Sequence, residues 1–171
     1  HRVPHGNVLG GDEGIGHGRR YALSALELGR INVASRSVGV AQAAFEAAMR
    51  YAQQRETFGR PIFEHQAIQF KLAEMATKLQ AARLMTYDAA KRADEGERVD
   101  MEAGMAKLFA SEAAFEIATD ALRIHGGNGY TTEFPVERYF RDTPLMIIGE
   151  GTSEIQKMVI ARKLRDRYPV E

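Results

Sequence analysis

Residues 64–94 read EHQAIQFKLAEMATKLQAARLMTYDAAKRAD, and this stretch decides the fold class. Its apolar side chains recur at alternating spacings of four and three residues, at Ile68, Leu72, Met75, Leu79 and Ala82. This spacing aligns the side chains along one face of a helix and is typical of the seam between packed helices. The stretch therefore predicts a long helix over about residues 64–94 that packs in a bundle.

Another long helix is predicted before it, over about residues 21–53. This part of the chain lacks proline, and apolar residues recur along one face at Leu26, Val33, Val40, Ala44, Ala47 and Tyr51. Gly29 and Gly39 each cost such a helix about 1 kcal/mol relative to alanine, so we expect both to be points of close packing. The run Phe58-Gly59-Arg60-Pro61 then breaks the helical pattern.

A third helix is predicted over about residues 101–124. The charged segment KRADEGERVD precedes it and is interpreted as a solvated turn with its bend at Gly96, so Asp100 is expected to be the helix N-cap. The apolar stripe of this helix contains Met101, Met105, Leu108, Phe115, Ala118 and Leu122. The three long helices predict an all-α fold.

Both ends of the chain are less regular. Residues 3–18, VPHGNVLGGDEGIGHG, are too rich in glycine for a regular helix and predict a loop with one short strand. Near the other end, a short helix is expected at residues 135–143. Ser153 with Gln156 fits a capping box for a last helix over about residues 153–166. The whole pattern predicts an antiparallel bundle of three long helices and one shorter helix.

Composition limits the kind of function. The 171 residues contain 23 lysines and arginines and 23 aspartates and glutamates, whereas nucleic-acid binding usually requires a net basic face. Cysteine is absent, which excludes disulfides and thiolate metal sites and fits a reducing compartment. The five histidines are scattered, so no metal site is expected. No apolar run approaches the roughly 18–20 residues of a membrane span, and no membrane association is expected.

Three segments carry residues that a simple bundle does not require. In QQRETFGRPI, at residues 53–62, the first arginine either faces a helix dipole or forms a fork for phosphate. In RIHGGNGY, at residues 123–130, the glycines either end a helix or expose bare backbone to a planar or phosphorylated ligand. In MIIGEGTS, at residues 146–153, Glu150 either complements a helix dipole or is a base with room for substrate on both sides. Composition alone leaves both interpretations of each segment open.

Taken together, these segments are similar to the acyl-CoA dehydrogenase family over essentially the whole chain. The matching motifs follow one another in order and at family spacing: VPHGNVLG, QRETFGRPIFEHQAIQFKLAEMA, RIHGGNGYTTEFPVERYFRD and IGEGTSEIQKMVIARKL. The resemblance implies that residues 19–171 form the family's carboxy-terminal four-helix bundle. Residues 1–18 are expected to be the end of its middle β-domain and a linker. The family's other domains are missing, so we expect this chain alone to bind FAD poorly and to be inactive.

The reaction that the resemblance implies is the α,β-dehydrogenation of an acyl-CoA thioester with FAD, a step of fatty acid metabolism. A glutamate removes the α-proton while the β-hydride passes to flavin N5, and the E-G-T motif places that base at Glu150. The Glu150 N–H is expected to bond the thioester carbonyl, and Gly151 to leave space for the thioester against the backbone. Some members keep the catalytic glutamate on the first helix, where this chain has Gly29.

Further roles follow from the resemblance residue by residue. Substrate contacts are expected at Glu27 and Arg30. Arg55 and Phe58 resemble the pair that meets the FAD of a neighbouring subunit, and Gln66 belongs to the same nucleotide site. The segment that resembles the family's contact to the FAD diphosphate and adenosine contains Arg123, Ile124, His125, Gly126 and Gly127. Thr152 and Glu154 resemble contacts to the other bound FAD.

The resemblance also implies partners. A cofactor site that crosses subunits implies a homodimer or homotetramer, and electrons are expected to leave to an electron-transfer flavoprotein. The expected compartment is the cytoplasm, or the mitochondrial matrix in a eukaryote. The alternative is a non-catalytic helical binding or oligomerisation module derived from the same family. The joint presence of Glu150, Arg30, Arg55 and the glycine loop argues against that alternative.

Overall fold

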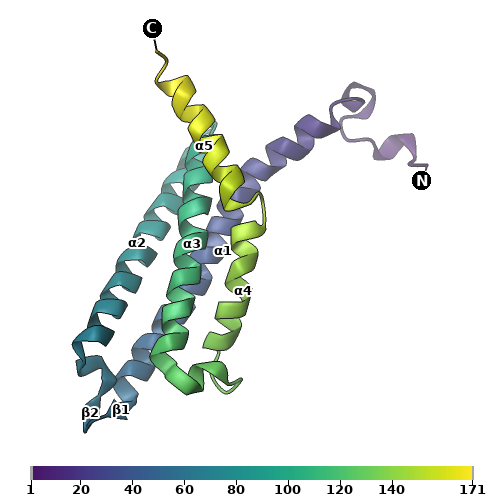
Figure 1. Ribbon diagram of the computed structural model, residues 1–171. Helices are drawn as coiled ribbons and strands as arrows, with labels where there is room; N and C mark the ends of the chain where they lie inside the picture. The colour runs from purple at the N-terminus through teal and green to yellow at the C-terminus, as the bar shows by residue number, and fades with distance from the viewer. Residues whose placement is uncertain (1, 171) are drawn as a thin grey trace.

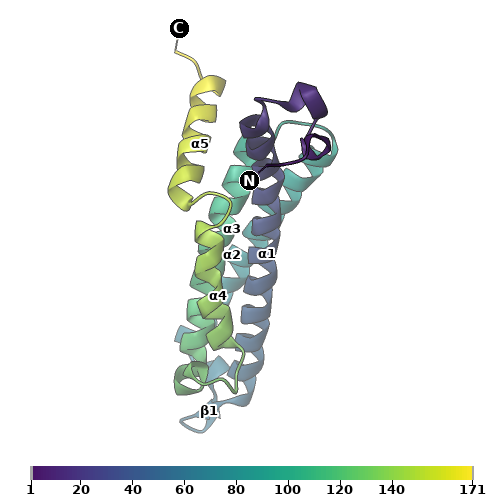
Figure 2. The same ribbon diagram turned by 90° about the vertical axis from the view of Figure 1, so that its right-hand side faces the viewer.

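The computed structural model describes residues 2–170 and consists mainly of an up-and-down bundle of helices (Figure 1). Its helices are α1 (Gly18–Gln54), α2 (Gln66–Asp94), α3 (Asp100–His125), α4 (Val136–Ile148) and α5 (Ser153–Arg167). Successive helices from α1 to α4 run in opposite directions, and α5 continues beyond the end of the bundle (Figure 2). The all-α antiparallel bundle predicted from the sequence is confirmed. Its fourth member is α4, because α5 packs mainly against α3.

Alanine forms most of the contact between α1 and α3. The fully buried alanines include Ala34, Ala41, Ala44, Ala48 and Ala52 on α1, and Ala103, Ala106, Ala110, Ala114, Ala118 and Ala121 on α3. Small side chains let helix axes approach closely, since interaxial distance depends on the residues at the contact. Larger buried side chains come from α2, where Leu72, Met75 and Leu79 confirm the predicted seam.

A small hairpin joins α1 to α2 at one end of the bundle (Figure 1). Strands β1 (Glu56–Thr57) and β2 (Arg60–Pro61) pair antiparallel. Both turn residues have positive φ, 52° at Phe58 and 77° at Gly59, as a type I′ turn requires. The sequence predicted the break in the helix here but not the strands. A 3-10 turn at Ile62–Glu64 follows, so α2 begins two residues later than predicted.

Two predicted helix caps are wrong. The N-cap of α3 is Val99, and Asp100 is instead the first helical residue, paired with Arg98 at 3.0 Å. The N-cap of α5 is Thr152, whose hydroxyl accepts from the Ile155 N–H. Each N-cap lies one residue earlier than predicted: at α5 the Thr152 hydroxyl makes the local cap, and at α3 the Glu27 carboxylate accepts from the Val99 N–H.

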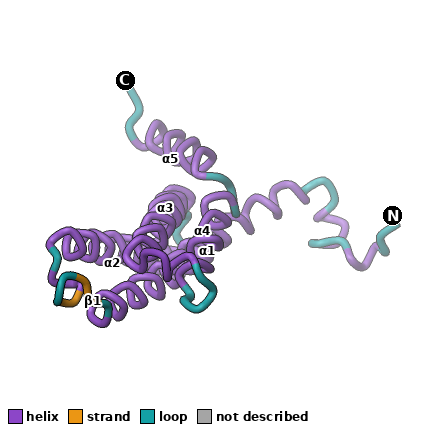
Figure 3. The backbone as a smooth tube through the Cα atoms, turned by 60° about the horizontal axis from the view of Figure 1, so that its bottom comes forward, coloured by secondary structure: helices purple, strands orange, loops and turns teal. Residues whose placement is uncertain are grey.

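The predicted short strand near the amino terminus is wrong for the described residues 2–18. These residues form two 3-10 turns, His5–Asn7 and Gly11–Gly14, and the segment projects away from the bundle (Figure 3). Helix α4 extends five residues beyond the expected 143 and contains Pro144. Among the described residues, no helix combines the length and apolar character needed to cross a bilayer.

Candidate functional site

The loop between α4 and α5 holds Glu150 in an unusual backbone conformation. Helix α4 ends at Ile148, and the Gly149 N–H donates to the Leu145 carbonyl of its last turn. Glu150 then has a φ of 54°, and Gly151 has a φ of 91°. The left-handed region is uncommon for a residue with a side chain, and such conformations cluster at functional sites.

The half-buried side chain of Glu150 reaches α1 and lies against Gly29. A Cβ on residue 29 would lie 2.7 Å from Cδ and 3.3 Å from Oε1 of Glu150. Glycine at position 29 therefore makes room for the carboxylate, which confirms the predicted close packing there. The same prediction is wrong for Gly39, where a Cβ would meet open space.

Arg30, the next residue of α1, is buried although it is charged. Its exposed fraction is 9%, and within residues 2–170 its Nε has no hydrogen-bond partner. A buried donor without an acceptor costs about 1–3 kcal/mol. Arg30 follows Gly29 in α1, and its charge acts on Asp100 and Lys107 of α3.

Two fully buried side chains hold the backbone of the Glu150 loop. Lys107 Nζ, from α3, donates to the carbonyls of Ile147 and Gly151, each at 2.9 Å. Gln156 Nε2, from α5, donates to the carbonyls of Glu150 and Gly151, each at 3.0 Å. The loop that carries Glu150 is thus tied to two helices.

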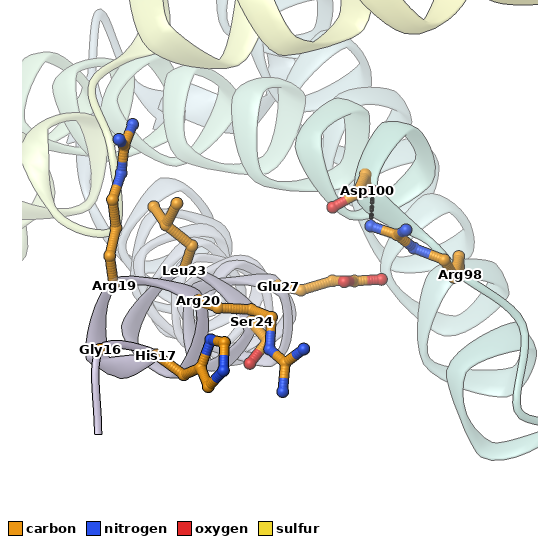
Figure 4. A pocket seen from close by; sticks show the side chains of 9 residues that line it. All are labelled: Gly16, His17, Arg19, Arg20, Leu23, Ser24, Glu27, Arg98 and Asp100. Atoms are coloured by element: carbon orange, nitrogen blue, oxygen red, sulfur yellow. Dashed lines mark hydrogen bonds and ion pairs between the residues drawn. The ribbon is translucent and has the colours of Figure 1, made fainter. Parts of the chain in front are cut away.

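Glu27 has a structural partner. Its Oε1 accepts from the Val99 N–H at 2.7 Å, which satisfies a free donor at the start of α3. Glu27 also lines a cavity of about 460 Å³ between the start of α1 and the start of α3 (Figure 4). The arginines around this cavity are Arg19, Arg20 and Arg98. Asp100 lines the same cavity and pairs with Arg98 at 3.0 Å, so three arginines and two carboxylates border it.

A different cavity, of about 400 Å³, lies at the opposite end of α1. Arg55 and Thr57, at the start of the hairpin, line one side of it. The other side is lined by the end of α3 and the glycine loop that follows, at Ile124, His125, Gly126 and Gly127. The fold thus brings together the predicted cofactor residues of two separate sequence motifs. Phe58, at the tip of the hairpin, lies outside this cavity lining and is 96% exposed.

The three glycines of the loop after α3 differ in backbone conformation and in the space around them. Gly126 ends α3 with φ 59° and ψ −134°, a conformation that side chains exclude. A Cβ on Gly129 would lie 2.5 Å from the Leu122 carbonyl oxygen, so this position is restricted by space. A Cβ on Gly127 meets nothing within 4 Å, so its bare backbone borders the open cavity.

His125 is fixed between two aromatic rings at this cavity. Its ring stacks on Tyr51 with centroids 4.2 Å apart and meets Phe134 edge-on at 5.4 Å. Its Nδ1 lies 2.7 Å from the Ala121 carbonyl, which can only accept, so Nδ1 carries the proton. Burial lowers the pKa of His125, although this hydrogen bond acts against the shift.

The remaining predicted residues lie away from these contacts. Gln66 is exposed at the start of α2, and Arg123 turns to Asp120 at 3.5 Å, on a different side of α3 from the cavity. Thr152 and Glu154 stand at the start of α5, close in sequence to Glu150. Of the predicted FAD residues, the structure therefore gathers Arg55 and residues 124–127 at one cavity, and Thr152 and Glu154 lie beside the Glu150 loop.

Sequence reasoning missed Lys107 and assigned Gln156 the wrong role. A signal for Lys107 was present, because it is a lone charge among Ala103, Gly104, Ala106 and Ala110 in the most apolar part of α3. Gly151 also has an internal reason: a Cβ there would lie 2.8 Å from Gln156 Nε2. Space for a substrate is therefore not needed to explain this glycine.

Comparison with known proteins agrees with this arrangement. Residues 16–165 match the family described as "Acyl-CoA dehydrogenase, C-terminal domain". A 3-(aryl)acrylate reductase of Clostridium sporogenes is 54% identical over 143 residues, 84% of this chain and 38% of that protein. The mitochondrial short-chain specific acyl-CoA dehydrogenase of Rattus norvegicus is 48% identical over 167 residues, 98% of this chain and 40% of that protein.

A solved structure shares the fold. Butyryl-CoA dehydrogenase from Megasphaera elsdenii superposes with a TM-score of 0.86 at 42% identity, over 87% of this chain and 39% of that one. This chain spans about two fifths of the length of the curated relatives it matches. It belongs to the acyl-CoA dehydrogenase family and corresponds to the carboxy-terminal helical domain of that family.

Proposed function

We propose that this chain supplies the base of an FAD-dependent acyl-CoA dehydrogenase, and that Glu150 removes the α-proton of the acyl thioester. The observation that carries the proposal is the position of the Glu150 carboxylate over Gly29, with the buried cation Arg30 next in the chain. A half-buried carboxylate on a conformationally restricted loop is suited to general base catalysis because its direction is fixed.

The protein's own groups can be assigned to the steps of proton removal. Glu150 takes the proton from Cα, and negative charge then develops on the thioester oxygen. Within residues 2–170 the Glu150 N–H donates to no backbone carbonyl, so it is available to that oxygen. When bound, FAD would supply the acceptor for the hydride that leaves Cβ.

The cavity beside Glu27 suits the coenzyme A part of the substrate. Arg19 and Arg20 line it beside Arg98, which pairs with Asp100, and the phosphates of coenzyme A are anions that guanidinium groups recognise well (Figure 4). Arg30 lies further along α1, one residue beyond Gly29. Under the proposal, the substrate follows the amino-terminal part of α1, with its thioester at Glu150.

The cavity at the other end of α1 fits a dinucleotide. The Arg55 guanidinium and the bare backbone of Gly126 and Gly127 border the same space, a combination suited to a diphosphate. Arg55 directly follows the last residue of α1 and comes 25 residues after Arg30 (55 − 30), which corresponds to roughly 38 Å at 1.5 Å per residue. Glu150 and this cavity are therefore expected to serve different FAD molecules, so we propose a homodimer or homotetramer whose FAD site crosses subunits.

The whole protein is proposed to pass its electrons to an electron-transfer flavoprotein, in the cytoplasm or, in a eukaryote, the mitochondrial matrix. Because this chain covers about two fifths of its relatives, the remaining enclosure of flavin and thioester must come from other domains. We accordingly expect the isolated chain to bind FAD poorly and to be inactive.

The decisive experiment is the Glu150→Gln variant of the full-length enzyme that contains this chain, loaded with FAD. We expect acyl-CoA to bleach the flavin absorbance of the wild type and not that of the variant, while both retain FAD. Glu46→Gln, an exposed glutamate elsewhere on α1, is the control and should bleach normally. Bleaching of Glu150→Gln at the wild-type rate would disprove the assignment.

A second candidate is the same chemistry in the direction of reduction. The Clostridium sporogenes relative is named a reductase of a 3-(aryl)acrylate, so its reaction adds hydrogen across a carbon–carbon double bond. In that direction Glu150 would deliver the proton to Cα. Mixing the dithionite-reduced enzyme with a 2-enoyl-CoA and with an arylacrylate tests this candidate: rapid re-oxidation of the flavin by the arylacrylate would support it, and re-oxidation by the 2-enoyl-CoA alone would support the acyl-CoA dehydrogenase.

A further inference from the structure

We infer that Lys107 is a positioning residue, whose ammonium clamps the Glu150 loop and so fixes the direction of the Glu150 carboxylate. The inference rests on the proposed function, in which that carboxylate is the base. Lys107 belongs to α3 and is 0% exposed, yet it ends in a group that water solvates strongly. Its position therefore requires an explanation within the protein.

The contacts of Lys107 enclose Glu150 on both sides along the chain. One acceptor, the Ile147 carbonyl, lies in the last turn of α4, and the other, the Gly151 carbonyl, follows Glu150 directly. A single ammonium therefore bridges two carbonyls, one before and one after Glu150. Removal of the ammonium would leave the Ile147 carbonyl without this donor and free one end of the loop.

Gln156 holds the same loop from α5. It is 0% exposed, and its amide donates to the carbonyls of Glu150 and Gly151. The two peptide groups that follow the Glu150 Cα are thus fixed by side chains from two different helices. Such over-determination is what keeps a residue in a sparsely populated backbone region, here the φ of 54° at Glu150.

A lysine in this position is costly for folding. Burial lowers the pKa of Lys107, and the charge of Arg30 acts in the same direction, against the attraction of Glu112 and Glu154. A methionine would avoid the desolvation of a charge but would leave the Ile147 carbonyl without the Lys107 donor. What lysine adds is a pair of donors for the loop carbonyls, so its contribution is to geometry.

The clamp is relevant to the rate because proton abstraction depends on position. A base must lie within hydrogen-bond reach of the proton it removes. A displacement of about 1 Å in such a site costs on the order of 100-fold in rate. Loss of the clamp should therefore slow the chemical step while binding of acyl-CoA, which uses other contacts, continues.

The experiment compares Lys107→Met with Lys71→Met in the full-length, FAD-loaded enzyme that contains this chain. Lys71 is a suitable control because it also reaches α3, where it pairs with Asp120, away from the Glu150 loop. Two quantities are measured: kcat and KM of flavin reduction by acyl-CoA, and amide hydrogen exchange in residues 147–153. For Lys107→Met we expect kcat to fall about 100-fold with KM little changed, and exchange to accelerate in that segment only. Lys71→Met should change neither.

The two measurements separate failure of the clamp from failure of the proposed function. Wild-type kcat with unchanged loop exchange in Lys107→Met would overturn the clamp. Faster exchange throughout the chain, with loss of FAD, would also overturn it as a local device. Faster loop exchange in an enzyme whose Glu150→Gln variant still reduces flavin would support the clamp and overturn the proposed role of Glu150. If Lys107→Met does not fold, Lys107→Gln tests the same clamp with a shorter, neutral side chain, and wild-type kinetics with unchanged exchange in residues 147–153 would overturn the inference.

Discussion

The carboxylate of Glu150 occupies the space that a side chain on Gly29 would need: Glu150 Cδ is 2.7 Å from the Cβ position of residue 29. Two positions that are far apart in the sequence, one in α1 and one between α4 and α5, thus converge on one point. A side chain at residue 29 and the observed position of the Glu150 carboxylate would overlap, so glycine at position 29 is linked to the direction of Glu150.

Gly29→Ala is therefore expected to impair catalysis while the bundle remains folded. The new methyl group would meet the far end of the Glu150 side chain, which can move aside at little cost to stability. The moved carboxylate should slow flavin reduction on the order of 100-fold in the full-length enzyme. Stopped-flow absorbance of the flavin measures this rate.

Gly39→Ala is the matched control for that substitution. Gly39 lies in the same helix with open space at its Cβ position, so alanine should stabilise the protein by up to about 1 kcal/mol and leave the rate unchanged. Equal rates in the two variants would contradict a catalytic requirement for glycine at position 29.

Glu27→Ala should destabilise the fold through the start of α3. The Val99 N–H, on a residue that is 1% exposed, would lose the Glu27 carboxylate that accepts its hydrogen bond. We expect a loss of about 1–3 kcal/mol in the free energy of unfolding, measured by urea denaturation. Glu46→Ala, which breaks only exposed contacts with Arg50 and Gln42, should cost less than about 1 kcal/mol. A Glu27 variant with unchanged stability and weakened substrate binding would contradict the capping role.

Arg55→Ala should weaken retention of FAD by the full-length enzyme. The guanidinium shares a cavity with Gly126 and Gly127, and a charge-assisted hydrogen bond contributes about 1.5–3 kcal/mol, or roughly 10-fold to 100-fold in affinity. FAD content after dialysis, read from the flavin absorbance, tests this expectation. Arg50→Ala, on the exposed face of the same helix, should retain its FAD. Equal FAD content in both variants would remove Arg55 from the cofactor site.

Acidification should destabilise the protein through His125. Burial lowers the folded-state pKa of His125 below its ordinary value of 6.5, so below pH 6.5 the unfolded chain binds this proton more readily. Stability should therefore fall as pH decreases from 6.5 towards the folded-state pKa, by at most about 1.4 kcal/mol per pH unit for one group. Urea denaturation at pH 7.5 and 5.5 measures the difference.

The control for this pH dependence is a histidine outside the core. His125→Leu should reduce the difference in stability between the two pH values, even if it lowers stability at both. His17→Asn, at the exposed start of α1, should retain the difference. Glu137 should contribute little to the difference in stability between pH 7.5 and 5.5. A hydrogen bond from Arg141 lowers the pKa of Glu137 and places its effect at more acidic pH.

The sequence predicted the helices well because their apolar periodicity is a local property. The seam at Leu72, Met75 and Leu79 is buried as expected. Helix ends were less predictable, because tertiary contacts decide them: the start of α3 is capped by Glu27, which is 72 residues earlier in the chain. No local pattern at Asp100 contains that information.

The candidate site was predicted in part for the same reason. The motifs indicated Glu150 and the glycine loop, but not that the Glu150 carboxylate would lie against Gly29. Lys107 stands out in the sequence as a lone charge, but its contacts could not be predicted. Its acceptors are backbone carbonyls of another segment, and every residue has such a carbonyl. Contacts between a side chain and a distant backbone require the fold to be known first.

The length of α1 has a consequence for how this sequence can change during evolution. The helix is an unbroken span from Gly18 to Gln54 that carries Gly29 and Arg30 near one end and leads into the hairpin at the other. Deletion of one residue between them would rotate one end against the other by about 100° and shorten the span by about 1.5 Å. Arg55 and the hairpin would then face away from the glycine loop while Glu150 stayed in place. The exposed positions of residues 31–54 should therefore accept substitutions, whereas a one-residue deletion anywhere in this segment should weaken cofactor binding even though Arg55 and the glycine loop are both retained.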